Sequence, residues 1–196
     1  MEYDPSVDSY MSWEVAITAM REDFLMGKRS DFPRKKLDFY PTPYETTLPL
    51  LAHLAPNTLF VEPCGGDYAL AEHLERNGHI CKYAADIEPK HHKVAHQDAT
   101  LIHSTGATCF ITNPPWAWKL LDPILSHLRS IKDTWLLLNA DVMHNKRMGT
   151  HMRHCRAVVS VGRVSWEGNG KAGMENSAWM CFTPEEQVTE FYGRAA

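Results

Sequence analysis

The stretch TLFVEPCGGD, residues 58–67, decides the fold class of this chain. An apolar run of strand length leads directly into a turn at Gly65 and Gly66, and apolar residues then recur at helical spacing as far as Asn77 and Gly78. A strand, a tight glycine turn and a helix form the opening of a nucleotide-binding α/β unit. The stretch therefore predicts that a ligand approaches the backbone at the carboxyl end of this strand.

Strands and helices continue to alternate after this turn. The last two apolar runs are joined by a glycine-rich loop that is too short for a crossover helix, which predicts an antiparallel hairpin. We therefore expect a Rossmann-like α/β fold: a doubly wound, mostly parallel seven-stranded sheet with an antiparallel C-terminal hairpin, in three layers α/β/α. The predicted strands after the first are residues 80–88, 94–99, 108–116, 134–143, 156–166 and 177–184, and the clearest later helix is residues 120–131.

The composition indicates one globular core. The chain has 196 residues, of which 44% are hydrophobic and 22% charged. We expect an N-terminal helix and basic linker at residues 1–37, followed by a single domain at residues 38–196. No run approaches the roughly 20 apolar residues of a membrane span, and the start of the chain lacks the pattern of a signal peptide. These features predict a cytoplasmic protein without a membrane partner, in the bacterial host cytoplasm if it is phage-encoded.

The cysteines and histidines do not form a pattern typical of a metal site. The five cysteines are scattered, and their odd number suits reduced thiols. His151, His154 and Cys155 lie close together in sequence but lack a second cluster at zinc-site spacing, so we predict no metal. The formal net charge of −4 argues against a non-specific nucleic-acid coat. Two basic stretches, within residues 28–36 and 146–156, are candidates for local nucleic-acid contact or for ordinary solvated faces.

Three acidic residues stand at the ends of successive predicted strands. Glu62 gives the glycine turn an acidic rim, which suits the amino group of a methionine moiety better than a phosphate. Asp86 follows Gly66 by about the 20 residues typical of a ribose-binding carboxylate, and Ile87 beside it can pack on an adenine ring. Asp98 can accept a hydrogen bond from the adenine amine. The alternative for each is a turn-forming role at a strand end.

The tetrapeptide Asn113-Pro114-Pro115-Trp116 ends an apolar strand. Two successive prolines stiffen the turn and leave the Asn113 amide oxygen and the Pro114 carbonyl as acceptors. An exocyclic amine on a base is a poor nucleophile, because its lone pair is delocalised into the ring. Two fixed acceptors can bind its hydrogens and favour attack on a methyl group, while Trp116 stacks on a base flipped out of the helix. The alternative is a proline strand end with Trp116 in the core.

The segments VEPCGGDYAL, DIEP, QDA and ITNPPW, in this order, resemble the motifs of class I S-adenosylmethionine-dependent methyltransferases. NPPW resembles the catalytic motif of the amino-group DNA methyltransferases, and DFYPTP at residues 38–43 resembles the N-terminal cofactor motif of their adenine-N6 members. The C-terminal part resembles small phage or prophage members. The resemblance covers roughly residues 38–183 and implies an enzyme that methylates adenine N6 in DNA, with S-adenosyl-L-methionine as cofactor.

The resemblance also implies a set of roles. The partner would be nucleic acid, with DNA favoured over RNA. An RNA base methyltransferase, a protein-amide methyltransferase and a degenerate methyltransferase-fold binding protein are the alternatives. The cofactor residues would be Tyr40, Thr42, Glu62, Pro63, Gly65, Gly66, Asp86, Ile87, Asp98 and Asn113, and the catalytic residues Asn113, Pro114, Pro115 and Trp116.

The sequence departs from this family pattern in two ways. Tyr68 stands where those enzymes often have another glycine, so its side chain is expected to narrow the cofactor pocket. No segment is long enough for a separate target-recognition region. We therefore expect the N-terminal helix, the loop at residues 167–176 and the stretch at residues 144–156 to supply the nucleic-acid surface, with relaxed or short sequence specificity.

Overall fold

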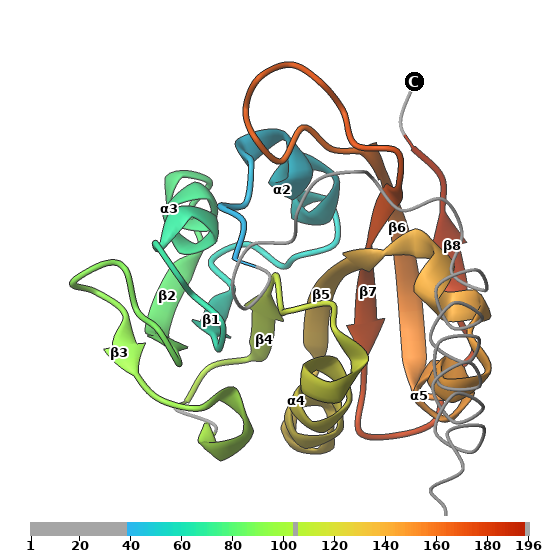
Figure 1. The fold of residues 1–196 in the computed structure, drawn as a ribbon. Coiled ribbons are helices and arrows are strands. Elements are labelled where there is room, and N and C mark those ends of the chain that lie inside the picture. The colour runs from blue at the N-terminus through green and yellow to red at the C-terminus, as the bar shows by residue number, and fades with distance from the viewer. Residues whose placement is uncertain (1–38, 104–105, 195–196) are drawn as a thin grey trace, which may run out of the picture. The chain divides into compact units, whose positions relative to one another are not determined.

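The computed structural model describes residues 39–103 and 106–194. This part of the chain forms an eight-stranded sheet with the order β3-β2-β1-β4-β5-β7-β6-β8 (Figure 1). The strands are β1 (Leu59–Glu62), β2 (Ile80–Asp86), β3 (Ala95–His96), β4 (Cys109–Thr112), β5 (Thr134–Asn139), β6 (Cys155–Arg163), β7 (Asn176–Phe182) and β8 (Glu190–Tyr192). The helices are α2 (Tyr44–Leu51), α3 (Ala69–Arg76), α4 (Trp118–Ile131) and α5 (Gly149–Met152), with 3₁₀ turns η2 (Ala99–Leu101), η3 (Ala140–His144) and η4 (Lys146–Met148).

The strand order reverses between β1 and β4. From β1 the chain moves outward through β2 to β3, all parallel, and then returns to place β4 on the other side of β1, again parallel. In open α/β sheets a ligand binds at such a switch point, beside the carboxyl ends of the strands. The topology therefore directs attention to the loops that follow β1, β2 and β4.

Both faces of the sheet are covered. On β5, Trp135 and Leu137 belong to one hydrophobic cluster, whereas the alternating Leu136 and Leu138 belong to another. The first cluster includes residues of α2 and α3 and the second includes residues of α4, which lies on the opposite face (Figure 1). The expected three-layer, Rossmann-like arrangement is confirmed, and so is the antiparallel C-terminal hairpin, since β7 runs antiparallel to both β5 and β6.

The eighth strand adds to the seven that the sequence predicts. β8 pairs in parallel with β6 at the edge of the sheet, and all three of its residues are exposed. A strand of three exposed residues has no burial pattern by which the sequence could reveal it. The helix and linker expected at residues 1–37 lie outside the described residues, so the domain boundary stays a prediction. Within the described ranges, no helix has the length and apolar character needed to cross a membrane.

Candidate functional site

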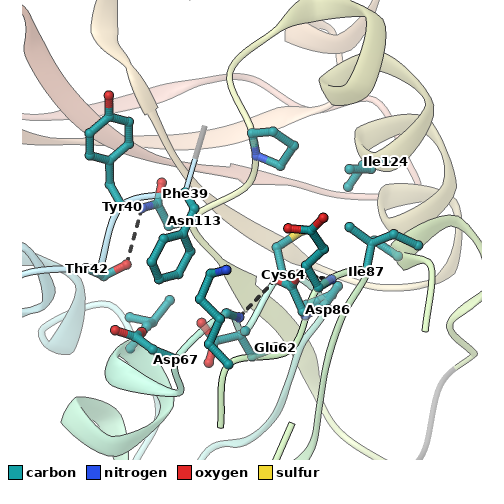
Figure 2. Close-up of a pocket in the computed structure, with 18 of the residues that line it drawn as sticks. Phe39, Tyr40, Thr42, Glu62, Cys64, Asp67, Asp86, Ile87, Asn113 and Ile124 are labelled. Carbon is teal, nitrogen blue, oxygen red and sulfur yellow. Dashed lines mark hydrogen bonds between the residues drawn. The ribbon is translucent and has the colours of Figure 1, made fainter. Parts of the chain in front are cut away.

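A cavity of about 320 Å³ lies at the carboxyl ends of β1, β2 and β4 (Figure 2). Its volume falls in the range of small-molecule sites, roughly 300–1,000 Å³. The cavity brings together most of the residues singled out in the sequence, from five separate segments of the chain. Those that line it are Tyr40, Thr42, Glu62, Pro63, Gly65, Gly66, Asp86, Ile87, Asp98, Asn113 and Pro115.

The glycine turn forms the floor of this cavity. The Gly65 amide donates to the Ala85 carbonyl at 2.7 Å, which joins the turn to the end of β2. Gly66 has a φ of +44°, and a Cβ on it would lie 2.6 Å from a ring carbon of Phe39. Real Cβ atoms do not approach that closely, so a glycine at position 66 is what lets the backbone and the Phe39 ring meet at the cavity.

Asp86 is held at the cavity wall by two backbone amides. Its Oδ2 accepts from Gly66 at 2.9 Å and its Oδ1 accepts from Glu88 at 2.7 Å. A carboxylate has about four acceptor positions, so each oxygen keeps one for a ligand. Ile87 is half exposed beside it and offers an apolar surface at the same rim (Figure 2). Hydroxyl groups of a sugar and one face of a flat ring would match this pair.

Glu62 is a buried carboxyl at the end of β1. It is only 2% exposed, and its Oε2 accepts from the Ala71 amide in the first turn of α3 at 3.1 Å. Burial raises the pKa of Glu62 well above its usual value, the hydrogen bond from Ala71 opposes this, and the nearby charges of Asp67 and Asp86 add to the rise. A positively charged group entering the cavity would stabilise the ionised form of Glu62.

Tyr68 does not narrow the cavity, so that expectation was wrong. The Tyr68 backbone takes the left-handed conformation, with φ 70° and ψ 7°, as a glycine would. Its ring turns away from the ligand side into the core, where it is 7% exposed and its hydroxyl donates to Glu75 at 3.1 Å. The side chain that crowds the glycine turn is Phe39 instead.

Asn113 stands where β4 ends, and its side chain is tied to the segment before α2. Its Nδ2 donates to Thr42 Oγ1 at 3.2 Å, across 71 residues of sequence (Figure 2). The Thr42 carbonyl in turn accepts from His73 of α3 at 3.1 Å. Because Nδ2 is engaged with Thr42, the amide is oriented and its oxygen is available to accept a hydrogen bond.

Of the tetrapeptide, Asn113 and Pro115 line the cavity, whereas Pro114 and Trp116 do not. Trp116 packs against the cluster beneath α4, and its Nε1 donates to the Leu137 carbonyl of β5 at 3.0 Å. Its ring meets Trp166 edge to face, with centroids 5.6 Å apart. The ring centroids of Trp166 and Tyr40 lie 6.2 Å apart, and Tyr40 lines the cavity. The aromatic residue next to the cavity's Tyr40 is therefore Trp166, from the loop after β6.

Asp98 has the turn-forming role that the sequence allowed, and it also lies at the cavity. It caps η2, with its Oδ1 accepting from the amide and hydroxyl of Thr100 at 2.8 Å each, and it also lines the cavity. Leu70, Leu120 and Ile124 line the cavity from helices, and an apolar helix position carries no signal that separates a pocket wall from core. The full set of lining residues to which the sequence analysis gave no separate role is Phe39, Cys64, Asp67, Leu70, Glu88, Lys90, Ala99, Leu120 and Ile124.

The basic stretch after β5 is divided between two sides of the sheet: the carboxyl edge, where the parallel strands end and the cavity lies, and the amino edge, where these strands begin. Arg156, near the start of β6, bonds Asp133 just before β5 at 3.1 Å, and so lies at the edge opposite the cavity. Arg153 pairs with Glu186 at 2.6 Å. Arg147 instead lies 5.3 Å from the ring of Trp118, the first residue of α4, which follows the NPPW turn. Within residues 39–103 and 106–194, no three His, Cys, Asp or Glu side chains gather as metal ligands would.

No protein-family model matches the sequence, and no curated protein has a detectably similar sequence. Solved structures share the fold. A candidate RNA methyltransferase from Pyrococcus horikoshii has a TM-score of 0.55 and 15% identity over 82% of this chain and 93% of that chain. A candidate class I S-adenosylmethionine-dependent methyltransferase from Listeria monocytogenes has a TM-score of 0.51 and 10% identity, over 83% and 68%.

A larger protein shows the same likeness. The M protein of the type I restriction enzyme EcoKI has a TM-score of 0.50 and 12% identity over 90% of this chain, which spans about half (51%) of that chain. At such identities the likeness concerns the fold. The described chain has the α/β fold of these methyltransferases.

Proposed function

We propose that this chain transfers a methyl group from S-adenosyl-L-methionine to an exocyclic amino group of a nucleic-acid base, with adenine N6 in DNA as the first candidate. The observation that carries the proposal is the Asn113 side chain, an oriented amide on the wall of a cavity at the switch point of the sheet. An amide in this place serves a reaction in which an amine must be bound through its hydrogens.

The cavity residues fit the cofactor by the chemistry of their donor and acceptor groups. The buried carboxyl of Glu62 suits the ammonium of the methionine part, and the fixed carboxylate of Asp86 suits the ribose hydroxyls. Ile87 and Asp98 would take the adenine face and the adenine amine. When bound, the cofactor supplies a methyl group on a positively charged sulfur, which an acidic lining favours.

The NPPW turn would act on the target amine. The Asn113 oxygen and the Pro114 carbonyl would each accept one hydrogen of the amine, which localises the nitrogen lone pair and orients it for attack. Thr42 would keep the Asn113 amide from rotating, because it already accepts from Nδ2. The prolines would keep both acceptors in place without reorganisation during the reaction.

We propose Trp166 as an aromatic wall for the flipped base, together with Tyr40. Trp116 has its indole nitrogen committed to the sheet and supports Trp166 from the side. Tyr40 lines the cavity together with Asn113, and Trp166 contacts Tyr40. Stacking on an aromatic ring holds a base that has left its helix. In this proposal Trp166 takes the stacking role that the sequence predicts for Trp116.

RNA is the second candidate substrate. The structural likeness to the Pyrococcus protein extends over nearly all of that chain, and it is named as a candidate RNA methyltransferase. The degenerate binding protein loses one of the two features that favoured it, since the Tyr68 ring lies outside the cavity lining, and keeps the other, the lack of a separate target-recognition region. Incubation with methyl-labelled cofactor and DNA, RNA or protein, followed by mass spectrometry of the nucleosides, separates these possibilities. Label in N6-methyladenine from DNA is the expected result; label in protein alone would reject the proposal.

Asn113→Ala is expected to lower methyl transfer about 100-fold or more, the usual loss for one preorganised hydrogen-bonding group. The cofactor dissociation constant, measured by calorimetry, should change little, because in this proposal the Asn113 oxygen acts on the target amine and not, as the resemblance also implied, on the cofactor. Asn139→Ala is the matched control: Asn139 also ends a central strand, but its oxygen caps the following 3₁₀ turn. Equal losses in both variants, or cofactor binding lost along with transfer, would contradict the assigned role.

A further inference from the structure

Tyr68 occupies a backbone conformation that its side chain disfavours. Among the described residues, Asn57 and Tyr68 are the non-glycine residues with positive φ. Asparagine tolerates this region because its short polar side chain bonds locally, whereas a tyrosine there is strained. Such a conformation persists only where the surrounding contacts over-determine it. The contacts of Tyr68 are therefore informative.

The Tyr68 ring holds the segment after β2 from one side. It stacks on the His91 ring, with centroids 5.3 Å apart and planes 16° from parallel. Lys93 Nζ lies 4.8 Å from the Tyr68 centroid and pairs with Glu75 at 3.9 Å. The Tyr68 hydroxyl donates to the same glutamate. Two residues of the segment are thus anchored to one aromatic ring at the start of α3.

The residue immediately before His91 reaches the cavity. Lys90 donates its backbone amide to the Gly66 carbonyl at 2.9 Å, which joins the segment to the glycine turn. Its Nζ lies 4.7 Å from the centroid of Phe39, the ring that crowds Gly66. Lys90 and Glu88 both line the cavity. Whatever fixes this segment therefore also fixes one wall of the cavity.

We propose that Tyr68 is a positioning residue that clamps residues 88–93 against the glycine turn and so shapes the cofactor pocket from outside. The inference rests on the proposed function in one respect, that the cavity takes an adenosine-containing cofactor. A glycine would satisfy the backbone conformation more easily but could not hold His91. Tyr68 thus accepts a strained backbone conformation, and its ring in return makes the contact with His91.

Calorimetry with S-adenosyl-L-homocysteine tests the clamp. Tyr68→Gly, which relieves the backbone strain, is expected to weaken binding at least fivefold, and Tyr68→Phe, which keeps the stacked ring, to stay within twofold of the wild type. His91→Ala should weaken binding as Tyr68→Gly does. The double variant should bind no more weakly than Tyr68→Gly alone, because both changes break one contact. Unchanged or tighter binding by Tyr68→Gly, or fully additive losses, would overturn the proposal.

Hydrogen exchange at the Lys90 amide gives a readout that needs no ligand. This amide bonds Gly66, so it should exchange faster in Tyr68→Gly and His91→Ala and at the wild-type rate in Tyr68→Phe. If the wild type fails to bind S-adenosyl-L-homocysteine, the proposed function is refuted, and the exchange rate alone decides the clamp. Wild-type exchange in His91→Ala, which leaves the core intact, would reject the clamp even if Tyr68→Gly does not fold.

Discussion

Adjacent glycines in the turn after β1 meet different constraints. At Gly65 an added Cβ would meet its nearest neighbours at 3.4–3.5 Å, an ordinary contact. At Gly66 it would collide with Phe39, and the backbone has a positive φ as well. The second glycine is thus required by the site, whereas the position of the first has room for a Cβ. The neighbouring Phe39 ring, and not the glycine turn alone, therefore decides which of the two positions must be glycine.

Glu62 gives the stability of the protein a pH dependence of known sign. Because burial raises its pKa, the folded protein keeps the proton over a range where the unfolded chain, with a pKa of about 4.3, has lost it. The stabilisation linked to this proton is complete below the unfolded pKa and is lost as the pH rises through the raised folded pKa.

The free energy of unfolding of the wild type should therefore fall with rising pH relative to Glu62→Gln, by up to about 1.4 kcal/mol per pH unit between the two pKa values. Glutamine keeps an oxygen to accept from Ala71 but does not titrate. Urea unfolding of both proteins at several values between about pH 4 and 8 measures the difference. A difference that stays constant with pH would show that Glu62 titrates normally in the folded protein.

At the scale of elements, the sequence predicts best those that are both long and buried. β5 and α4 were foreseen within a few residues, because an apolar run and a helical repeat leave little choice. β3 is only two residues long and β8 has no buried side chain, so neither has a full pattern of its own. Their pairing depends on neighbours that already stand in the sheet.

The candidate site divides in the same way. Residues at strand ends, such as Glu62, Asp86 and Asn113, could be located because the motifs name the ends of parallel strands, which meet at one edge. The direction in which a side chain points could not be predicted from the sequence. Tyr68 and Trp116 both turn away from the cavity, and each finds a hydrogen-bond acceptor and apolar neighbours elsewhere: Tyr68 on α3 and Trp116 on β5. Such choices are made by tertiary packing, which no local pattern records.

The loop after β6 should serve the target rather than the cofactor. Trp166→Ala removes the ring that contacts both Trp116 and Tyr40, so methyl transfer is expected to fall about tenfold or more, at roughly 1–3 kcal/mol per stacked base. Cofactor affinity should remain near that of the wild type. Met174→Ala, which removes an exposed apolar side chain from the same loop, is the control. Equal effects of the two changes on nucleic-acid KM would mean that the loop acts without a specific contact from Trp166.

At the scale of the whole molecule, we expect nucleic acid to bind at one of the two edges of the sheet, the one that holds the cavity. The cavity lies at the carboxyl edge, while the Arg156–Asp133 pair lies at the amino edge. Arg156→Ala should therefore leave the KM for nucleic acid within about twofold, and its effect on stability should be small, since exposed pairs contribute about 0–1 kcal/mol. Steady-state kinetics on the substrate identified by label transfer measures this. A tenfold rise in KM would place nucleic acid at the amino edge as well and would require a second contact surface.

Residues 39–43 enter the cavity from outside the strand-and-turn framework. Phe39, Tyr40 and Thr42 all line it, yet they precede the first strand of the sheet. A ligand that fills the cavity would contact both residues 39–43, called the strap here, and the strand ends of the sheet. It would therefore hold the strap against the sheet. Ligand affinity and protection of the strap from proteases should consequently rise and fall together, so that limited digestion becomes a direct gauge of occupancy.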